Sequence, residues 1–422
     1  MRTPPASFAR LASLLSWCIA ATVVATVHPA TPVGAQAGDE VAPRFSAAEL
    51  LAPDIVKGPH HQVDAAVRTD GYFHEFTVVS TFGTFTAVGR SELAVRIREI
   101  TALAALDEVS RTEVFLASAG QSVVKIGQGA AAAVTDPVST VKGVGAGVKR
   151  FGVNLGRRTQ RAVESAGDGA TEEGGNAAAG AASSVLGVSG AMRQWARKVG
   201  ADPYTTNPVL RKALEDVARV DAAGSIVTKV AVPIPAPVGT LSSVGDLVWG
   251  QDPEAVRKAN EGSLRGLGVP ADVAARLFGN RWFTLTAQTR LVAALVTVRA
   301  PGVADYVQTA ADARNAREAL FFVESAEMLQ QHHGRQPVVQ ILSDSRAVVV
   351  VGADRHVRAL LPLDWIASTD VTRAAIGDIT TRARQELRGS RFELDVTGRV
   401  SDRVRGELEK LGWVVTSRET AR

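Results

Sequence analysis

The chain has 422 residues, of which 46% are hydrophobic and 21% are charged, and its formal net charge is +4. This length predicts two or three domains, and the apolar content is sufficient to fill their cores. The single cysteine, Cys18, excludes stabilisation by internal disulfides, and the small net charge by itself predicts no class of partner.

Residues 1–37 have the pattern of a secretory signal peptide. Arginines precede an apolar run over residues 11–27, and an Ala-Gln-Ala cleavage site at 35–37 stands before Gly38. Polar residues interrupt the apolar run, so an uncleaved membrane anchor is the weaker alternative. A lipoprotein is also disfavoured, because Trp17 stands where a small residue should precede the cysteine. We therefore expect an exported protein, periplasmic or extracellular, that is soluble or peripherally associated with a membrane.

Residues 38–110 predict a β-hairpin followed by a helix. β-Branched and aromatic residues dominate on both sides of a Phe-Gly pair at 82–83, which suits a tight turn. Ser91 is expected to cap the following helix, in which Leu93 and Ile100 belong to an apolar series at helical spacing. Because a two-stranded ribbon is only marginally stable alone, we expect the hairpin to pack on this helix.

Residues 111–164, hereafter the basic segment, predict an amphipathic helical arm capped by Asp136. One face carries an apolar stripe of Val141, Val144, Val148, Phe151 and Leu155. The candidate contact residues of this arm are Lys142, Lys149, Arg150, Phe151 and Arg157. Each glycine in the helix costs about 1 kcal/mol relative to alanine, so the helix should form only against a surface. That surface is the protein's own core, another helix or protein, or an anionic membrane face.

Residues 165–190 predict a flexible linker and the main domain boundary, because they contain almost no large apolar side chains. Residues 191–335 then predict a helical domain. An Asp or Asn precedes proline at 202–203, 207–208 and 252–253, which is typical of helix starts, since the acid or amide caps and proline loses no hydrogen bond. Further helices are expected over 271–277, 286–298 and 304–331.

Residues 336–422 predict an α/β unit. Short β-rich runs, VVQIL, AVVVV and VRALLPL, are followed by a helix opening at Thr369 or Asp370, a strand RFELDV, a helix capped by Ser401 and a last strand WVVTS. Strand, helix and strand in this order predict parallel pairing with a right-handed crossover. The predicted fold class is therefore mixed α+β, with an N-terminal β-hairpin plus helix, a largely helical middle and a small C-terminal α/β unit.

Histidines and strand-end acids offer the main route to an enzyme. The pairs His60-His61 and His332-His333 are each made of neighbours, which diverge by about 100° on a helix, so neither pair is a preformed metal site. Asp395 and Asp402 flank a turn at the end of a predicted parallel strand, where open α/β sheets hold ligands. Capping is the simpler role of Asp402. We predict no metal, no cofactor and no identifiable catalytic residue.

Nucleotides and nucleic acids are not predicted partners. A phosphate loop needs a second glycine followed by Lys and Ser or Thr, whereas Gly147 is followed by Val148 and no strand precedes it. The basic cluster has Phe151 as its one aromatic residue, which is too few for stacking on bases.

The expected function is an interaction or structural role in the cell envelope without catalysis. The partner would be an anionic membrane surface or an envelope protein, contacted through the basic segment. The alternative is a periplasmic hydrolase with a site in the helical and α/β units, near His332, His333 or Asp395. A pocket that gathers the four histidines would favour the hydrolase, and scattered histidines would favour the interaction protein.

Overall fold

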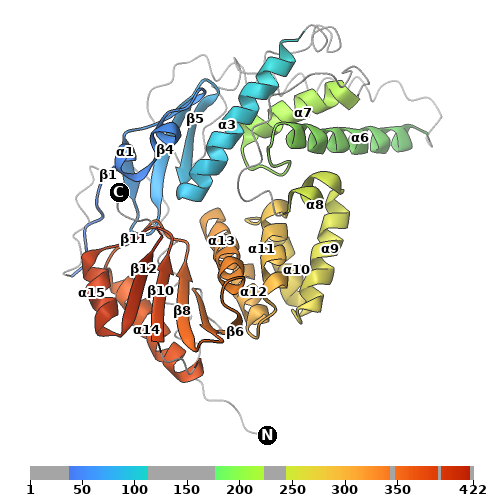
Figure 1. Cartoon of the computed structure of the whole chain (residues 1–422). Coiled ribbons are helices and arrows are strands. Elements are labelled where there is room, and N and C mark those ends of the chain that lie inside the picture. The colour runs from blue at the N-terminus through green and yellow to red at the C-terminus, as the bar shows by residue number, and fades with distance from the viewer. Residues whose placement is uncertain (1–37, 113–175, 223–243, 343–346, 388–390, 419–422) are drawn as a thin grey trace, which may run out of the picture.

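The computed structural model describes residues 38–112, 176–222, 244–342, 347–387 and 391–418 (Figure 1). These residues form a mixed α+β fold with an N-terminal antiparallel half-barrel sheet, a helical middle and a C-terminal mixed sheet with helices. The predicted fold class is thereby confirmed. Within the described part of the chain, no helix combines the length and the apolar character that crossing a membrane requires.

The N-terminal sheet is built around one long strand. Its strands are β1 (Phe45–Ser46), β2 (His61–Val63), β3 (Ala66–Thr69), β4 (His74–Ser80) and β5 (Gly83–Val88), with the short helices α1 (Ala47–Leu50) and α2 (Pro53–Val56) between β1 and β2. β4 pairs antiparallel with β2, β3 and β5. Ser80 is opposite Gly83 in the register, so the β4–β5 hairpin turns at Thr81 and Phe82, one residue before the predicted Phe-Gly pair.

Helix α3 (Arg90–Ser110) follows the hairpin directly and packs on it through Leu93 and Ile100, which are fully buried. The predicted cap at Ser91 is wrong. The helix begins one residue earlier, behind Gly89, whose φ of 87° is a conformation that glycine adopts without strain. Ser91 therefore lies inside the first turn.

Two further helices complete this N-terminal core. α6 (Asn176–Lys198) and α7 (Pro208–Ala222) pack on each other, and α7 also packs on α3. Trp195 and Leu210 share one buried cluster with the sheet and α3. The sequence predicts a flexible linker up to residue 190, but the structure has helix from Asn176. Alanine, which is abundant there, has the highest helix propensity of any residue.

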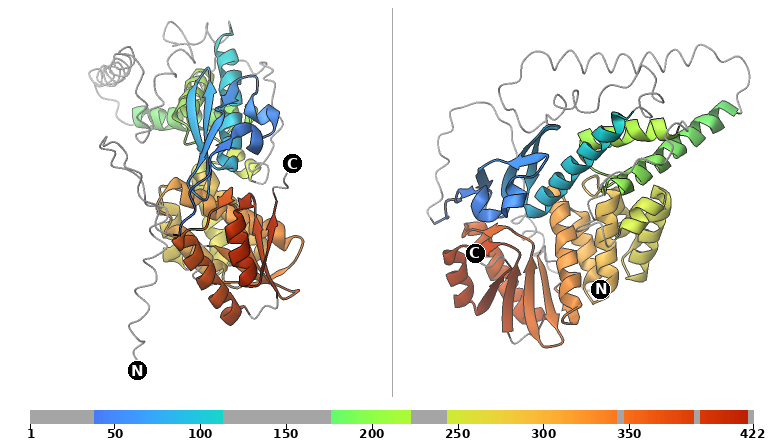
Figure 2. Two further views of the ribbon diagram at one scale, coloured as in Figure 1. Left: turned by 90° about the vertical axis from the view of Figure 1, so that its left-hand side faces the viewer. Right: turned by 45° about the horizontal axis from the view of Figure 1, so that its top comes forward.

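The helical middle consists of short helices joined by tight connections. They are α8 (Gly245–Gly250), α9 (Pro253–Gly266), α10 (Ala271–Gly279), α11 (Leu285–Val298), α12 (Val303–Ala311) and α13 (Ala316–His333). The continuous helix predicted over 304–331 is two helices, because Asn315 starts a new one by accepting a hydrogen bond from the Glu318 N–H at 2.9 Å. In Figure 2, α3, α6 and α7 lie across one end of this group.

The C-terminal sheet has the strand order β12-β10-β8-β7-β6. Its strands are β6 (Val338–Ile341), β7 (Val348–Gly352), β8 (His356–Leu361), β10 (Arg391–Val396) and β12 (Trp413–Ser417). β8, β10 and β12 are parallel, joined by α14 (Asp370–Glu386) and α15 (Asp402–Lys410), as predicted. The short strands β9 (Trp365–Ile366) and β11 (Arg399–Val400) form a separate parallel pair beyond the strand ends.

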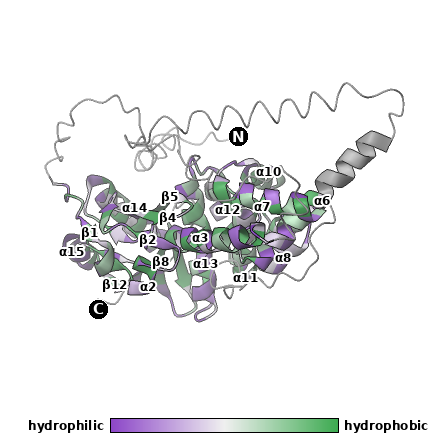
Figure 3. Ribbon diagram, turned by 90° about the horizontal axis from the view of Figure 1, so that it is seen from above, coloured by the Kyte–Doolittle hydropathy of each residue, from purple (hydrophilic) through white to green (hydrophobic). Residues whose placement is uncertain are grey.

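Both faces of β7 are buried, which explains its continuous run of valine. Val348 and Val350 of β7 belong to the cluster of α11, α12 and α13, whereas Val349 and Val351 belong to the cluster of α14 and α15. The helical middle thus covers one face and the crossover helices cover the other. α15 lies at the edge of the molecule and is coloured mostly hydrophilic in Figure 3.

Candidate functional site

Of the basic segment, the structure describes only Arg111 and Thr112, at the end of α3. Lys142, Lys149, Arg150, Phe151 and Arg157 all lie outside the described residues. The structure does describe the helices on either side, because α3 ends at Ser110 and α6 begins at Asn176, and both belong to one hydrophobic core. The chain therefore leaves and re-enters the same folded unit around the basic segment.

The structure does not gather the two histidine pairs. His61 lies in β2, where its Nε2 is 3.1 Å from the carbonyl oxygen of Ile55. His332 and His333 end α13, and His333 Nδ1 accepts a hydrogen bond from the Val338 N–H at 3.1 Å. The other end of α13 lies near the N-terminal sheet, where Arg317 pairs with Asp70 in the loop between β3 and β4. Among the described residues, no group of three His, Cys, Asp or Glu could hold a metal ion.

The two strand-end acids differ, since Asp395 is paired and Asp402 is exposed. The carboxylate of Asp395 receives two hydrogen bonds from the guanidinium of Arg418, at 2.8 and 3.0 Å. Asp402 is the first residue of α15 and is exposed, while Ser401 caps that helix by accepting from the Val404 N–H at 3.2 Å. The capping role expected for Asp402 therefore belongs to Ser401.

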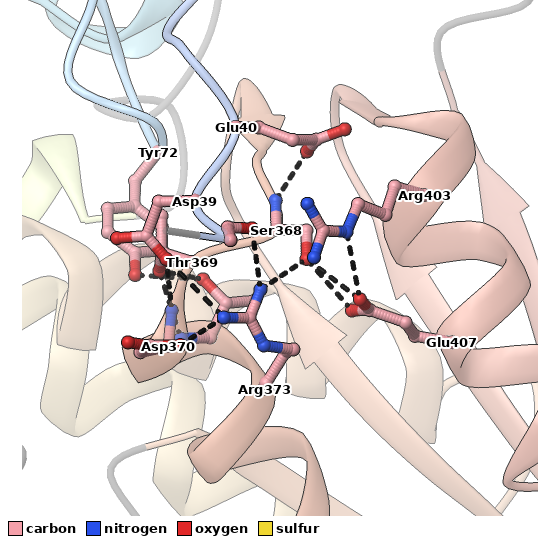
Figure 4. A network of polar contacts seen from close by, with 11 residues as sticks. Asp39, Glu40, Tyr72, Ser368, Thr369, Asp370, Arg373, Arg403 and Glu407 are labelled. Atoms are coloured by element: carbon pink, nitrogen blue, oxygen red, sulfur yellow. Dashed lines mark hydrogen bonds and ion pairs between the residues drawn. The ribbon is translucent and has the colours of Figure 1, made fainter. Parts of the chain in front are cut away.

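The carboxyl edge of the parallel strands is occupied by the chain's own N-terminal residues (Figure 4). We call this contact the seam, formed by residues 38–46 and 70–74 on one side and residues 364–373 and 398–407 on the other. An open α/β sheet commonly holds its ligand at this edge. In this protein, acids and backbone groups of the N-terminal region occupy the edge instead.

Glu40 is the central acid of the seam. Its Oε2 accepts a hydrogen bond from the Ser368 N–H at 2.5 Å and another from the Ser401 hydroxyl at 2.6 Å. The Glu40 N–H donates to the Ser368 carbonyl at 2.9 Å. One residue thereby joins the loops that follow β9 and β11, immediately before α14 and α15.

Asp39 and Arg373 extend the seam over the start of α14. Asp39 Oδ1 accepts from the Asp370 N–H at 2.8 Å and lies 3.4 Å from an Arg373 nitrogen. Arg373 also donates to the Ser368 hydroxyl at 2.9 Å, and that hydroxyl donates to Glu407 at 2.9 Å. Negative charge beside the first turn of a helix is favourable, because the free N–H groups there carry partial positive charge.

A second part of the seam is made by the loop between β3 and β4. The Tyr72 carbonyl accepts from the N–H groups of Asp364 and Trp365 at 3.0 and 3.1 Å. Asp364 Oδ2 in turn accepts from the His74 N–H at 3.0 Å. Gly398 lies directly on the backbone of Asp364, where a Cβ would be 1.9 Å from the carbonyl oxygen, so only glycine fits.

His74 is buried inside the seam, with 1% of its surface exposed. Its ring packs edge-on against Phe45, with the centroids 4.8 Å apart. Burial, together with the charges of Arg90 and Arg399, lowers the pKa of His74 to about 4. The imidazole is therefore neutral near pH 7, and it cannot act there as a charged acid.

A second polar cluster joins α3 to the helical middle. The Glu99 carboxylate accepts from the Thr205 hydroxyl, from Asn207 Nδ2 at 3.0 Å and from Arg96 at 2.8 Å. Nearby, Asp202 accepts from the Thr286 hydroxyl at 2.6 Å. Burial raises the pKa of Asp202 to about 6. These acids are held by hydrogen bonds across elements that are distant in the sequence.

The prediction that Asp202-Pro203 starts a helix is wrong. Residues 202–206 form a turn, in which Asp202 accepts from the Tyr204 N–H at 2.9 Å, and α7 begins behind Asn207. The Asn207 side chain accepts from the N–H groups of Val209 and Leu210, as a cap should. Asp-Pro suits tight turns as well as helix starts, so the dipeptide alone does not decide between them.

An open cleft of about 410 Å³ lies beside this turn. It is bounded by the turn itself, by the start of α9 and by the start of α11. Its lining includes Tyr204, Thr206, Arg211, Arg257 and Thr284. Asp202 and Glu99 are not lining residues, but Thr205, which lines the cleft, donates to Glu99.

The sequence carries a signal for the cleft but none for the seam. The predicted Xaa-Pro helix starts at 207–208 and 252–253 flank the cleft, and the 202–203 pair forms its turn. The hydrophobic periodicity of the sequence cannot indicate that these three Xaa-Pro pairs lie close together in the fold. Asp39 and Glu40 follow the predicted cleavage site as two ordinary acids, and nothing in the sequence indicates partners more than 300 positions away.

Comparison of the chain with known protein families, with curated proteins and with solved structures gives no match.

Proposed function

We propose that this protein is an exported component of the cell envelope with an interaction or structural role. In this proposal the basic segment contacts an anionic membrane surface or an envelope protein. The described fold serves as the scaffold that presents the segment.

The observation that carries the proposal is the occupied carboxyl edge of the C-terminal sheet. Glu40 spans the loops in which an α/β enzyme would hold its substrate, by hydrogen bonds to Ser368 and Ser401. The hydrolase alternative receives less support, because His61 and His332 belong to separate regions and Asp395 is paired with Arg418.

The position of the basic segment also supports a scaffold role. Residues on both sides of it, such as Leu103 in α3 and Trp195 in α6, are buried in one core. An insertion between two helices of one core is anchored at both ends. Such a segment can bind a surface while the fold on either side stays intact.

Co-sedimentation with lipid vesicles tests the proposal. Each Lys or Arg near an anionic surface contributes on the order of 1 kcal/mol, so reversing three charges should weaken binding about a hundredfold or more. We expect the wild-type protein to sediment with anionic vesicles but not with neutral ones, and less so as salt is raised. The variant Lys142→Glu, Lys149→Glu, Arg150→Glu should stay in the supernatant.

The matched control reverses the same number of charges on the described surface. Lys258, Arg265 and Lys410 are exposed, so the triple Glu variant at these positions changes the net charge equally. It should still sediment with anionic vesicles. If both triple variants lose binding equally, the effect is one of net charge and the contact does not lie in the basic segment. If the wild type ignores anionic vesicles, the membrane form of the proposal fails.

A further inference from the structure

The open cleft described above is built from the beginnings of helices. Pro253 is the first residue of α9 and Leu285 is the first residue of α11, and both line the cleft. Asp252 and Thr284 cap these helices through their own side chains. N–H groups at these helix starts are thus already hydrogen-bonded, so the helix dipoles add only a small positive potential to the cleft.

Two arginines give the cleft its positive charge. Arg211 from the first turn of α7 and Arg257 from the second turn of α9 line it, and both are exposed. Within the described ranges, no carboxylate forms an ion pair with either side chain. By contrast, Arg219 on α7 pairs with Glu215 and Asp216. A guanidinium presents a planar set of donors that matches the oxygens of a carboxylate or a phosphate.

Tyr204 supplies a neutral donor inside the cleft. Its hydroxyl oxygen is buried and has no hydrogen-bond partner among the described residues. Burial raises the pKa of Tyr204, so the hydroxyl keeps its proton and can donate it. A buried hydroxyl without a partner is unfavourable, and an acceptor brought by a ligand would remove that cost.

The acids near the cleft are already engaged. Arg193 and Arg257 act on the Tyr204 hydroxyl, and so do Asp202 and Asp252 with the opposite sign. Asp252 accepts from two N–H groups of α9, each at 3.0 Å, and Asp202 accepts from Thr286. Among the lining residues of the cleft the charged side chains are Arg211 and Arg257, and both are exposed.

We propose that this cleft binds a small organic molecule through an oxyanion group, a phosphate or a carboxylate. Arg211 and Arg257 hold the oxyanion and the Tyr204 hydroxyl donates to it. Pro203, Pro253 and Leu285 provide apolar surface for the organic body. A volume of about 410 Å³ falls within the range of small-molecule sites. The inference goes beyond the proposed function, because it concerns the folded cleft and does not depend on the basic segment.

Calorimetric titration of the purified protein with three probes of similar size tests the ligand class. Phenyl phosphate and phenylacetate carry the two oxyanions, and benzyl alcohol is the neutral counterpart. We expect at least one oxyanion probe to bind more tightly than benzyl alcohol, with an affinity that falls as salt rises. The stronger of the two oxyanions identifies the head group. Equal affinity for all three probes, or binding of none, would overturn the proposal.

Three variants and one control assign the binding to the cleft. Arg211→Gln and Arg257→Gln should each weaken the preferred oxyanion about tenfold, as for loss of a charge-assisted hydrogen bond. Tyr204→Phe keeps the ring and should weaken it about threefold. Arg265→Gln removes an equally exposed arginine of α9 that does not line the cleft, and binding should be unchanged.

The thermal midpoints of the variants separate lost binding from lost folding. Arg211 and Arg257 have no ion-pair partner within the described ranges, so the midpoints of their variants should match that of the wild type. Tyr204→Phe removes a buried hydroxyl that has no partner there, so its midpoint should be equal or higher. Weaker binding at a midpoint that has not fallen supports the site. If the three variants bind as tightly as the wild type, or if Arg265→Gln weakens binding as much as they do, the site is not this cleft.

Discussion

The seam and the cleft use helix beginnings in opposite ways. At the seam, α14 and α15 begin beside Asp39 and Glu40, whose carboxylates accept hydrogen bonds at the two helix starts. At the cleft, α9 and α11 begin beside Arg211 and Arg257, which have no carboxylate partner in the described part of the chain. The seam contains carboxylates of the chain itself, whereas the cleft contains arginines without such a partner.

The seam is therefore a contact within the fold, whereas the cleft has charged groups that can still bind a ligand. Where the anion belongs to the chain, positive helix ends become part of the fold, and their loss should appear as lost stability. Where the cations lack an internal partner, they add little to stability, and their loss should appear as lost binding. The two regions therefore predict different outcomes for substitutions of similar chemistry.

We expect the largest loss of stability from Glu40→Ala in the seam. The substitution removes the acceptor of the Ser368 N–H and of the Ser401 hydroxyl. Leaving such donors without a partner should lower the free energy of unfolding by about 2–3 kcal/mol. Urea denaturation followed by tryptophan fluorescence measures it, since Trp365 lies in the seam and contacts Phe45.

Two variants serve as controls for this prediction. Glu40→Gln keeps a carbonyl oxygen as acceptor and should lose less than half as much. Glu409→Ala removes an exposed acid of α15 and should stay within about 0.5 kcal/mol of the wild type. A loss for Glu40→Ala no larger than that for Glu409→Ala would mean that the seam does not stabilise the fold.

The two regions should also respond to acid in opposite directions. The pKa of His74 in the seam is lowered to about 4, so the unfolded chain binds its proton first and stability falls between about pH 6.5 and 4. The pKa of Asp202 beside the cleft is raised to about 6, so the folded chain binds its proton first. Its contribution to stability rises as the pH falls from about 6 to 4.

Difference curves isolate these two contributions. The free energy of unfolding of the wild type is measured across this range and compared with those of His74→Phe and Asp202→Asn. Relative to His74→Phe, the wild type should lose stability on acidification by on the order of 1 kcal/mol or more. Relative to Asp202→Asn, it should gain stability. Two curves of the same sign would contradict the opposition between the regions.

We expect the smallest change in stability from the ion pair of Asp39 and Arg373 at the rim of the seam. Both side chains are partly exposed, so a double-mutant cycle with Ala at each position should give a coupling of about 0.5 kcal/mol. High salt should abolish it. A coupling that persists in high salt would indicate a pair more shielded from solvent than the structure describes.

Much of the fold follows from local patterns. The hairpin around residues 82–83 and the parallel β8-α14-β10 unit depend on β-branched runs, turns and caps that lie close together in the sequence. The predicted helix boundaries are wrong where contacts between distant parts of the chain determine the start of a helix. Ser91 is a good cap by type, but the chain turns at Gly89, which can adopt a positive φ. Residues up to 190 lack large apolar side chains, yet α6 starts at Asn176.

The seam and the cleft are harder to predict from the sequence than the fold is. Asp202-Pro203 is predicted to start a helix but forms a turn, and the Asp202 side chain there accepts a hydrogen bond from Thr286, which is 84 positions away. Arg211 and Arg257 are two among 47 basic residues, and only the structure brings them to one cleft. The role of the basic segment stays a prediction, because its candidate contact residues lie outside the described ranges.

The seam joins positions that are far apart in the sequence. Glu40 is separated from Ser368 by 328 positions and from Ser401 by 361. The ribosome therefore makes Glu40 more than 300 residues before either of its donors. Contacts between such distant positions carry a large loop-closure cost and form late in folding. A chain that stops before Ser401 cannot complete the seam, so a prematurely terminated product keeps its N-terminal end undocked and open to proteases.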